Sequence, residues 1–358
     1  MQEKQLWSLV NTIAPPEEPA RQAAHAHWDA CAKPLGGLGL LETMIEEMAA
    51  LTGSAELCLS RRTLLVFCAD NGVVAEGVSQ TGSEVTAVVA RQLGAGNSTA
   101  CRMAAVARCT VLPVDMGILN PPELPGVVNA RVANGTGNIA RGPAMTREQA
   151  AEAVVKGMEL ARAQKEAGAQ LLAAGEMGIG NTTTATAVTC ALLGLDPATV
   201  TGRGAGLSDA GLARKVRAIR QALAVNRPDP DDALDVLAKV GGLDIAGLCG
   251  LFLGGALYRV PVLMDGVITA AAALCAVRLC PVAAKAVFAS HCSAEPCGQL
   301  LLDALHKEPL ITAGMHLGEG TGALAAIPLL DMALAVYHGS TFSDYGMQAY
   351  TPQEETEC

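Results

Sequence analysis

The chain has 358 residues, of which 51% are hydrophobic and only 3% are aromatic. Its 25 basic and 35 acidic side chains give a formal net charge of −10, and no basic stripe or set of stacking rings favours a nucleic-acid partner. This length can bury a sizeable core, and the composition predicts a cytoplasmic protein that handles small molecules.

Helical and strand-like segments follow one another along the chain. Residues 1–55 are mainly helical, with clear helical spacing over 21–32. Apolar runs that end in a polar, glycine-containing corner then predict buried parallel strands, with helices between them over 147–167 and 209–226. The C-terminal part is again helical over 322–340. The strand-like runs are 63–72, 109–117, 169–178, 260–266 and 285–295.

This order predicts an α/β fold, in which helices flank a parallel sheet in a Rossmann-like arrangement. We expect a large α/β domain over 56–293, and a small, mainly helical domain built from 1–55 and 294–358. Each strand-like run has an acid, amide or hydroxyl at its carboxyl end. Because ligands of open parallel sheets bind outside the carboxyl ends of the strands, we expect the site at that edge.

Two long apolar runs, 245–258 and 267–277, are shorter than the roughly 20 residues that span a bilayer, so we expect buried elements and no membrane segment. The N-terminal stretch lacks the apolar region of a signal peptide. The 12 cysteines form no Cys-x-x-Cys pair and no His/Cys cluster at zinc spacing. We therefore expect reduced cysteines and no metal site.

The stretch GEMGIGNTT, residues 175–183, joins a predicted strand to a threonine-led helix. Amides at a helix N-terminus favour an anion, so Gly178, Gly180, Asn181 and Thr182 are candidate ligands of a phosphate. The lysine of a nucleotide triphosphate loop is missing, which favours a monophosphate. A glycine turn with helix caps explains the same letters, and the stretch alone does not separate these two interpretations.

A second glycine corner lies at 201–207 and precedes a predicted helix. Gly204 can offer its amide to an anion, and Lys215 on that helix is a candidate phosphate partner. A solvated lysine is the alternative for Lys215.

Two glutamates are candidates for acid–base chemistry. Glu176 follows an apolar strand directly, and Glu319 stands between glycines in LGEGTGA, residues 317–323. Burial among glycine, leucine and alanine raises the pKa of a carboxyl group and makes it a better base near neutrality. The alternative is a glutamate that offsets the dipole of a helix N-terminus.

The stretch SHCSAEPCG, residues 290–298, offers a further set of polar side chains. Ser290 and His291 could belong to a hydrolase triad, but no Gly-x-Ser-x-Gly elbow is present. Ser293 fits better as a helix cap or a phosphate donor, and Cys292 lacks a convincing base to activate it as a nucleophile.

Taken together and in order, these segments resemble the nicotinate-nucleotide–dimethylbenzimidazole phosphoribosyltransferase family. The resemblance covers nearly the whole chain, and the motif set is highly specific. It is carried by KPLGGLGLLE (33–42), CADNGV (68–73), EVTA (84–87), VDMGI (114–118), GNIARGPAM (137–145), GEMGIGNTT (175–183), VLAKVGGLDIAG (236–247), LMDG (263–266), SHCSAE (290–295) and LGEGTGA (317–323).

The resemblance implies transfer of phosphoribose from nicotinate mononucleotide to the lower-ligand base of a cobamide, which gives an α-ribotide 5′-phosphate and releases nicotinate. It also implies a six-stranded parallel sheet, a helical lobe from both chain ends, a homodimer, and no cofactor or metal. By the same resemblance Glu319 is the catalytic base, Glu176 lies near the ribose, and Lys215 and Ser293 lie near the phosphate. The expected acceptor pocket comprises Thr81, Val89, Met177 and Leu317.

Three positions depart from the family pattern. Asn71 stands where the family often has histidine, and His316 stands where it often has arginine before Leu-Gly-Glu-Gly. Val89 takes the place of a glutamine that can bond the second ring nitrogen of a benzimidazole. Leaving that nitrogen unpaired would cost about 1–3 kcal/mol, so the change favours a phenol, which has no such nitrogen.

Three alternatives to benzimidazole activation by a homodimer therefore stay open. The chain could transfer phosphoribose to phenol or p-cresol as one subunit of a heterodimer of paralogues, or it could be the non-catalytic subunit of such a heterodimer. Retention of Glu319, Glu176 and Lys215 disfavours the non-catalytic role. A different nucleotide-dependent α/β enzyme that shares only the fold is disfavoured by the ordered motif set.

Overall fold

The computed structural model describes residues 1–351 and contains a six-stranded sheet in the order β3-β2-β1-β4-β5-β6. All neighbouring strands are parallel. The predicted α/β class is confirmed, and each strand-like run holds a strand. The strands are β1 (Arg62–Ala69), β2 (Thr110–Gly117), β3 (Val128–Asn129), β4 (Leu171–Met177), β5 (Val262–Met264) and β6 (Val287–Ala289). The short edge strand β3 was not predicted, because two residues leave no apolar run to detect.

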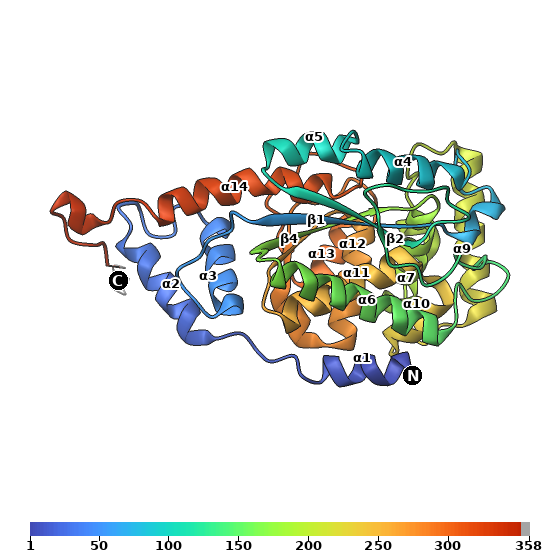
Figure 1. The fold of residues 1–358 in the computed structure, drawn as a ribbon, viewed down its shortest axis with the longest axis horizontal. Coiled ribbons are helices and arrows are strands. Elements are labelled where there is room, and N and C mark those ends of the chain that lie inside the picture. Colours follow the sequence, from blue (N-terminus) through green and yellow to red (C-terminus); the bar gives the residue numbers. More distant parts are fainter. Residues whose placement is uncertain (352–358) are drawn as a thin grey trace, which may run out of the picture.

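Helices cover both faces of the sheet (Figure 1). Helices α4, α5 and α14 pack on one face, and α6, α11 and α12 lie on the other. The helices are α1 (Gln2–Val10), α2 (Glu18–Ala30), α3 (Leu40–Thr52), α4 (Glu84–Gly94), α5 (Thr99–Val106), α6 (Arg147–Glu166), α7 (Asn181–Leu193), α8 (Pro197–Val200), α9 (Asp209–Asn226), α10 (Ala233–Val240), α11 (Leu243–Leu257), α12 (Val267–Leu279), α13 (Gly298–Leu305) and α14 (Thr321–Tyr337), with 3₁₀ turns η1 (Gly72–Glu76), η2 (Pro281–Ala286) and η3 (Phe342–Tyr345).

Glycine allows α6 and α11 to pack with their backbones close together. A Cβ at Gly157 of α6 would lie 2.0 Å from the carbonyl oxygen of Gly247, and a Cβ at Gly250 of α11 would lie 1.9 Å from that of Val154. No larger residue fits at such a crossing, because interiors are packed to crystal-like density. A composition that is poor in aromatic residues and rich in glycine thus allows helices to pack closely together over β1, whose residues are all buried.

The two long apolar runs form α11 and α12, whose residues are almost all buried. They are hydrophobic on every side because each is covered by other helices as well as by the sheet. Over residues 1–351, no helix combines the length and the apolar character that crossing a membrane demands.

Segments from both chain ends lie side by side beyond the sheet, where α2 and α3 meet the end of α14 (Figure 1). The ring of Trp28 in α2 meets Tyr337 of α14 edge-on, with centroids 4.8 Å apart. Arg62 at the start of β1 is buried, bonds Asp331 of α14 and donates to the carbonyl oxygen of Ala107 over 2.9 Å. The start of α14, however, contacts β4 and β5 of the sheet, so the proposed division into two domains stays a prediction.

Candidate active site

A cavity of about 250 Å³ opens at the carboxyl edge of the sheet. The order in which strands are added changes side between β1 and β4. Strands β2 and β3 are added on one side of β1, whereas β4, β5 and β6 are added on the other. Loops that follow strands on both sides of this point line the cavity, as expected for a parallel sheet. The lining residues are 78–80, 176–182, 203–205, 207, 265–269, 291, 293, 295 and 316–319.

The loop after β4 brings the start of α7 to the cavity. Gly180 has a φ of +92°, and a Cβ at Gly178 would lie 2.4 Å from the carbonyl oxygen of Ala69, so both positions require glycine. Asn181 and Thr182 follow as the first residues of α7, and both line the cavity. The loop thus presents the positive end of a helix dipole to the cavity.

The second glycine corner lies across the cavity and is held by Lys215 of α9. The Lys215 side chain is fully buried, and its Nζ donates to Thr182 Oγ1 over 2.8 Å and to the carbonyl oxygen of Gly202 over 3.0 Å. Burial lowers the pKa of Lys215 to about 8, although the charge of Glu295 acts in the opposite direction. The lysine does not line the cavity itself, and its amine reaches the cavity edge through the Thr182 hydroxyl.

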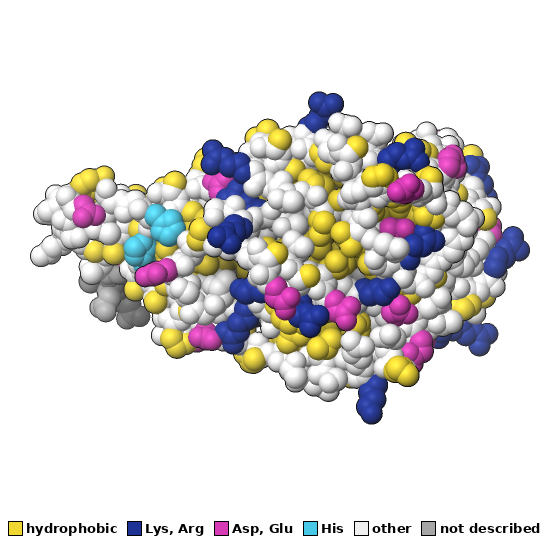
Figure 2. Space-filling view, viewed as in Figure 1, with side chains coloured by type: hydrophobic (Ala, Val, Ile, Leu, Met, Phe, Trp, Pro, Cys, Tyr) yellow, Lys and Arg dark blue, Asp and Glu magenta, His cyan; other side chains and the backbone are white. Residues whose placement is uncertain are grey.

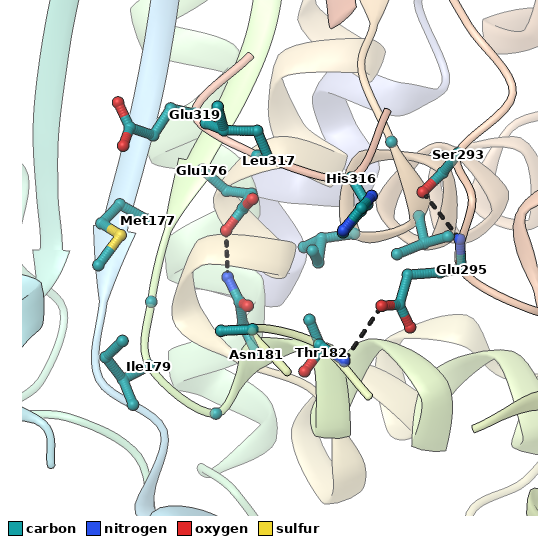
Figure 3. A pocket seen from close by; sticks show the side chains of 18 of the residues that line it. Glu176, Met177, Ile179, Asn181, Thr182, Ser293, Glu295, His316, Leu317 and Glu319 are labelled. Atoms are coloured by element: carbon teal, nitrogen blue, oxygen red, sulfur yellow. Dashed lines mark hydrogen bonds between the residues drawn. The ribbon is translucent and has the colours of Figure 1, made fainter. Parts of the chain in front are cut away.

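Glu295 lies between the glycine corner and the loop after β6. Its carboxylate accepts the Gly204 amide over 3.1 Å, and its own amide donates to Ser293 Oγ over 3.4 Å (Figure 3). A Cβ at Gly202 would overlap the Glu295 carboxylate, so glycine there lets the carboxylate take this position. Sequence reasoning gave Glu295 no role, although it follows the Ser-His-x-Ser motif directly.

Glu176 is a strongly perturbed acid of the cavity. It is the penultimate residue of β4, is 6% exposed, and accepts a hydrogen bond from Asn181 Nδ2 (Figure 3). Burial is the main cause that raises the pKa of Glu176 to about 8, and the Asn181 amide acts against this rise. The charges of Asp244, Asp265 and Glu319 raise the pKa further. The carboxyl group is therefore protonated over most of the neutral range.

Glu319 is the middle one of three consecutive residues that have a left-handed backbone conformation. Gly318, Glu319 and Gly320 have φ values of +89°, +58° and +80°. This backbone conformation costs about 1–2 kcal/mol for glutamate, which has a Cβ. A Cβ at Gly175 of β4 would lie 2.9 Å from the Glu319 carbonyl, so glycine there lets the turn lie against the sheet. The Glu319 carboxylate accepts the Ala100 amide over 3.4 Å at the start of α5, and it points away from Glu176 (Figure 3).

Asp265 and His291 also line the cavity, and sequence reasoning assigned neither a role in transfer. Asp265 follows β5 and accepts the amides of Gly320 over 3.2 Å and Gly322 over 2.7 Å, so it fixes the start of α14. His291 Nδ1 lies 3.8 Å from Asp265 Oδ1 and 3.1 Å from Ser290 Oγ. The sequence did contain a signal for both, because each residue lies in the polar corner that ends a predicted strand-like run.

The geometry does not support the hydrolase alternative. Ser290 is fully buried, does not line the cavity, and donates its hydroxyl proton to the Met264 carbonyl oxygen over 2.5 Å. Cys292 also lies outside the cavity lining, and burial raises the pKa of its thiol. Ser293 does line the cavity, with its hydroxyl toward Glu295.

The predicted acceptor residues are not all brought together. Met177 and Leu317 line the cavity, whereas Thr81 and Val89 do not. Thr81 is exposed in the turn before α4, and Val89 is a half-buried residue of α4 that packs on the core. The assignment of these four residues to the acceptor stays a prediction.

Two of the departures from the family pattern lie close to the site. His316 lines the cavity, and its Nδ1 lies 3.1 Å from the Gly314 carbonyl oxygen. Asn71 is buried beneath the loop after β4, where its Oδ1 accepts the Thr184 hydroxyl over 3.2 Å. Within residues 1–351, no group of three or more His, Cys, Asp or Glu side chains could hold a metal ion.

Comparison with known proteins gives matches along almost the whole chain. A family model described as a phosphoribosyltransferase matches residues 13–347, which include every strand and every residue that lines the cavity. The nicotinate-nucleotide–dimethylbenzimidazole phosphoribosyltransferase of Ruminiclostridium cellulolyticum is 42% identical over 346 residues, which cover 96% of this chain and 98% of that protein. The protein of the same name from Geobacter metallireducens is 43% identical over 345 residues and is covered to 98%. The crystal structure of CobT from Thermus thermophilus matches with a TM-score of 0.87 at 41% identity, over 92% of this chain and 99% of that one.

Proposed function

The chain belongs to the nicotinate-nucleotide–dimethylbenzimidazole phosphoribosyltransferase family, and on that premise we propose that it transfers phosphoribose from nicotinate mononucleotide to 5,6-dimethylbenzimidazole, the lower-ligand base of a cobamide. The products are the α-ribotide 5′-phosphate and nicotinate. One observation carries the proposal: two glutamates on different elements flank a cavity that is also walled by the start of α7 and the second glycine corner.

The donor phosphate binds between the loop after β4 and the second glycine corner. The Gly178–Thr182 segment and Ser293 line this part of the cavity, and Lys215 reaches its edge through the Thr182 hydroxyl. Helix N-termini and an amine that is charged below a pKa of about 8 favour a dianion. Glu295 already bonds the Gly204 amide, so this amide becomes a phosphate donor only when the carboxylate turns away.

Transfer is a single displacement at the anomeric carbon. A nitrogen of the acceptor forms the new bond, the bond to the pyridinium nitrogen breaks, and nicotinate leaves with that electron pair. Glu319 takes the proton from the other acceptor nitrogen, while Glu176 binds the ribose as a protonated, hydrogen-bond-donating acid. Holding donor and acceptor in line supplies much of the rate enhancement.

The acceptor lies against Met177 and Leu317 in this proposal. Transfer to phenol or p-cresol is the alternative, favoured by Val89 at the position of the family glutamine. The side chain at this position lies outside the cavity lining, which weakens the argument that its loss selects phenols. A panel of benzimidazoles and phenols, with products identified by mass, distinguishes the two acceptor classes.

We also propose that the enzyme is a cytoplasmic dimer. Each of the 11 cysteines within residues 1–351 is a free thiol, which suits a reducing compartment. Val106 of α5 and Met332 of α14 are 78% and 61% exposed on helices that pack together, which gives an apolar face suited to a partner subunit. Lys and Arg side chains are dispersed among acids on the face in Figure 2, so this face offers no basic stripe for nucleic acid.

Glu319→Gln tests the catalytic assignment. We expect turnover to fall about 10²- to 10⁴-fold, the usual contribution of a general base, while calorimetry shows unchanged binding of nicotinate mononucleotide. Glu56→Gln, an exposed glutamate before β1, is the matched control and should leave turnover unchanged. Equal turnover in Glu319→Gln and the parent enzyme would remove Glu319 from the role.

A further inference from the structure

Asp244 is a buried carboxylate that the proposed transfer does not use. It is the second residue of α11, it is 0% exposed, and it does not line the cavity. Its Oδ1 accepts the amide of the next residue, Ile245, over 3.0 Å. Its Oδ2 accepts Asn181 Nδ2, also over 3.0 Å. A buried carboxylate is costly unless its partners compensate it, so its place behind the cavity calls for an explanation.

Asn181 joins Asp244 to the cavity. Its Nδ2 donates to Asp244 on one side and to Glu176 on the other, so the two amide hydrogens serve two carboxylates from α11 and β4. The orientation of the amide follows from the chemistry, because both neighbours are acceptors and only the nitrogen can face them. Three side chains from three elements thus form one chain of hydrogen bonds that ends at the cavity.

Glycines lie directly beside both carboxylates of this chain. A Cβ at Gly178 would lie 2.7 Å from Asp244 Oδ2, and a Cβ at Gly242 would lie 2.4 Å from Oδ1. A Cβ at Gly318 would lie 2.7 Å from Glu176 Oε1. Glycine at these positions therefore leaves room for both carboxylates, and any side chain there would displace them.

We propose that Asp244 is a positioning residue that, acting through Asn181, orients the Glu176 carboxyl group toward the ribose, and that its own charge opposes loss of the Glu176 proton. The inference rests on the proposed transfer reaction and deepens it, because it explains what holds this acid of the cavity in place. It also gives Asn181 a different task from the phosphate contact predicted from the sequence.

The titration behaviour of the pair agrees with the hydrogen bonds. Burial is the first cause that raises the pKa values of both groups, to about 8 for Glu176 and about 6 for Asp244, and the charge of Asp244 adds to the rise at Glu176. When Asp244 is ionised, its charge opposes loss of the Glu176 proton. Other titratable groups around the pair come from every neighbouring strand end: Cys68 and Asp70 from β1, Asp265 after β5, His291 after β6 and Glu319 before α14.

Difference infrared titration of the full-length enzyme tests the proposal without substrate. We expect the band of a protonated carboxyl group to disappear with a midpoint near pH 8, and to be missing in Glu176→Gln. Asp244→Asn keeps the shape but removes the charge, so the midpoint should fall by about one pH unit. Asn181→Ala removes the bond that favours ionised Glu176, so the midpoint should rise.

Opposite shifts in the two variants are the signature of this arrangement, since general loosening of the fold would move both midpoints toward the ordinary value. Asp115→Asn, a buried acid of β2 separated from Glu176 by β1, is the matched control and should leave the midpoint in place. If circular dichroism shows that Asp244→Asn does not fold, the direction of the infrared midpoint shift in Asn181→Ala decides whether the proposal holds.

An unchanged midpoint in folded Asp244→Asn, or a downward shift in Asn181→Ala, would overturn the proposal. The pH profile of kcat/KM for nicotinate mononucleotide should move in parallel with the infrared midpoint. A parent enzyme without turnover would refute the proposed function, whereas the infrared titration would still decide the inference.

Discussion

The buried Glu176 carboxyl group makes a specific prediction about stability and pH. Its pKa lies near 8 in the folded protein and near 4.5 in the unfolded chain. The folded state therefore binds more protons between these values, and stability falls as pH rises through this window. Glu176→Gln removes the titrating group but keeps its shape, so the variant should escape this loss.

The structure sets the size of the effect. An interval of about 3.5 pH units at about 1.4 kcal/mol per unit gives a ceiling of about 5 kcal/mol at pH 8 and above. The glutamine must place its NH₂ group beside Gly318, where Glu176 Oε1 lies, and an imperfect partner there costs about 1–3 kcal/mol. We expect Glu176→Gln to exceed the parent enzyme by about 2–4 kcal/mol at pH 8.5 and to lose this advantage at pH 5.

Urea unfolding of both proteins, followed by circular dichroism from pH 5 to 9, measures this difference directly. Lys215 and Asp244 titrate in both proteins, so the difference between the two curves isolates Glu176. Glu148→Gln, an exposed acid at the start of α6, is the matched control and should not change with pH in this direction. Parallel curves for Glu176→Gln and the parent enzyme would refute the reasoning, because they would mean that Glu176 is ionised in the folded state at neutral pH.

Three further predictions follow from other contacts. Lys215→Met should weaken binding of nicotinate mononucleotide at least about tenfold by calorimetry at pH 7; equal binding would exclude the lysine from the phosphate site. It should also reduce, without abolishing, the fall in affinity that we expect of the parent enzyme as pH rises through about 8, because Glu176 loses its proton in the same range. Gly322→Ala puts a Cβ 1.9 Å from His291 Nδ1 and should cost about 1–3 kcal/mol in urea unfolding, whereas Gly142→Ala meets nothing within 4 Å and should be neutral. Arg62→Met leaves buried carbonyl acceptors unpaired and should lower the free energy of unfolding by about 2–3 kcal/mol; unchanged unfolding would mean that its hydrogen bonds add nothing net.

Local patterns predicted most of the fold. Each predicted strand ends in a polar corner, and in a parallel sheet those corners meet at one edge, which is why the location of the cavity could be expected. The helix predicted over 209–226 matches α9, whose Ser208 cap and regular apolar spacing mark its limits. Strand β3 and the contact of α14 with the sheet depend on tertiary packing and leave no periodic signal.

The site was only partly predictable for a similar reason. Glycine-rich corners and isolated acids pointed to Glu176, Glu319 and the loop after β4, all of which line the cavity, while their roles stay predictions. The role of Asp244 could not be read from its sequence, because the second residue of an apolar helix ordinarily offsets the helix dipole. Only the fold brings this carboxylate within 3.0 Å of the Asn181 amide.

The hydrogen bonds between Asp265 and the start of α14 couple the packing of the sheet edge to the assembly of the site. Asp265 is 3% exposed, and its carboxylate depends on backbone amides that lie more than fifty residues further along the chain. The same turn places Glu319 at the cavity. Without this turn, Asp265 would be an unsatisfied acid at the edge of the sheet and the site would lack its proposed base, so one turn completes both the packing of the sheet edge and the reactive centre.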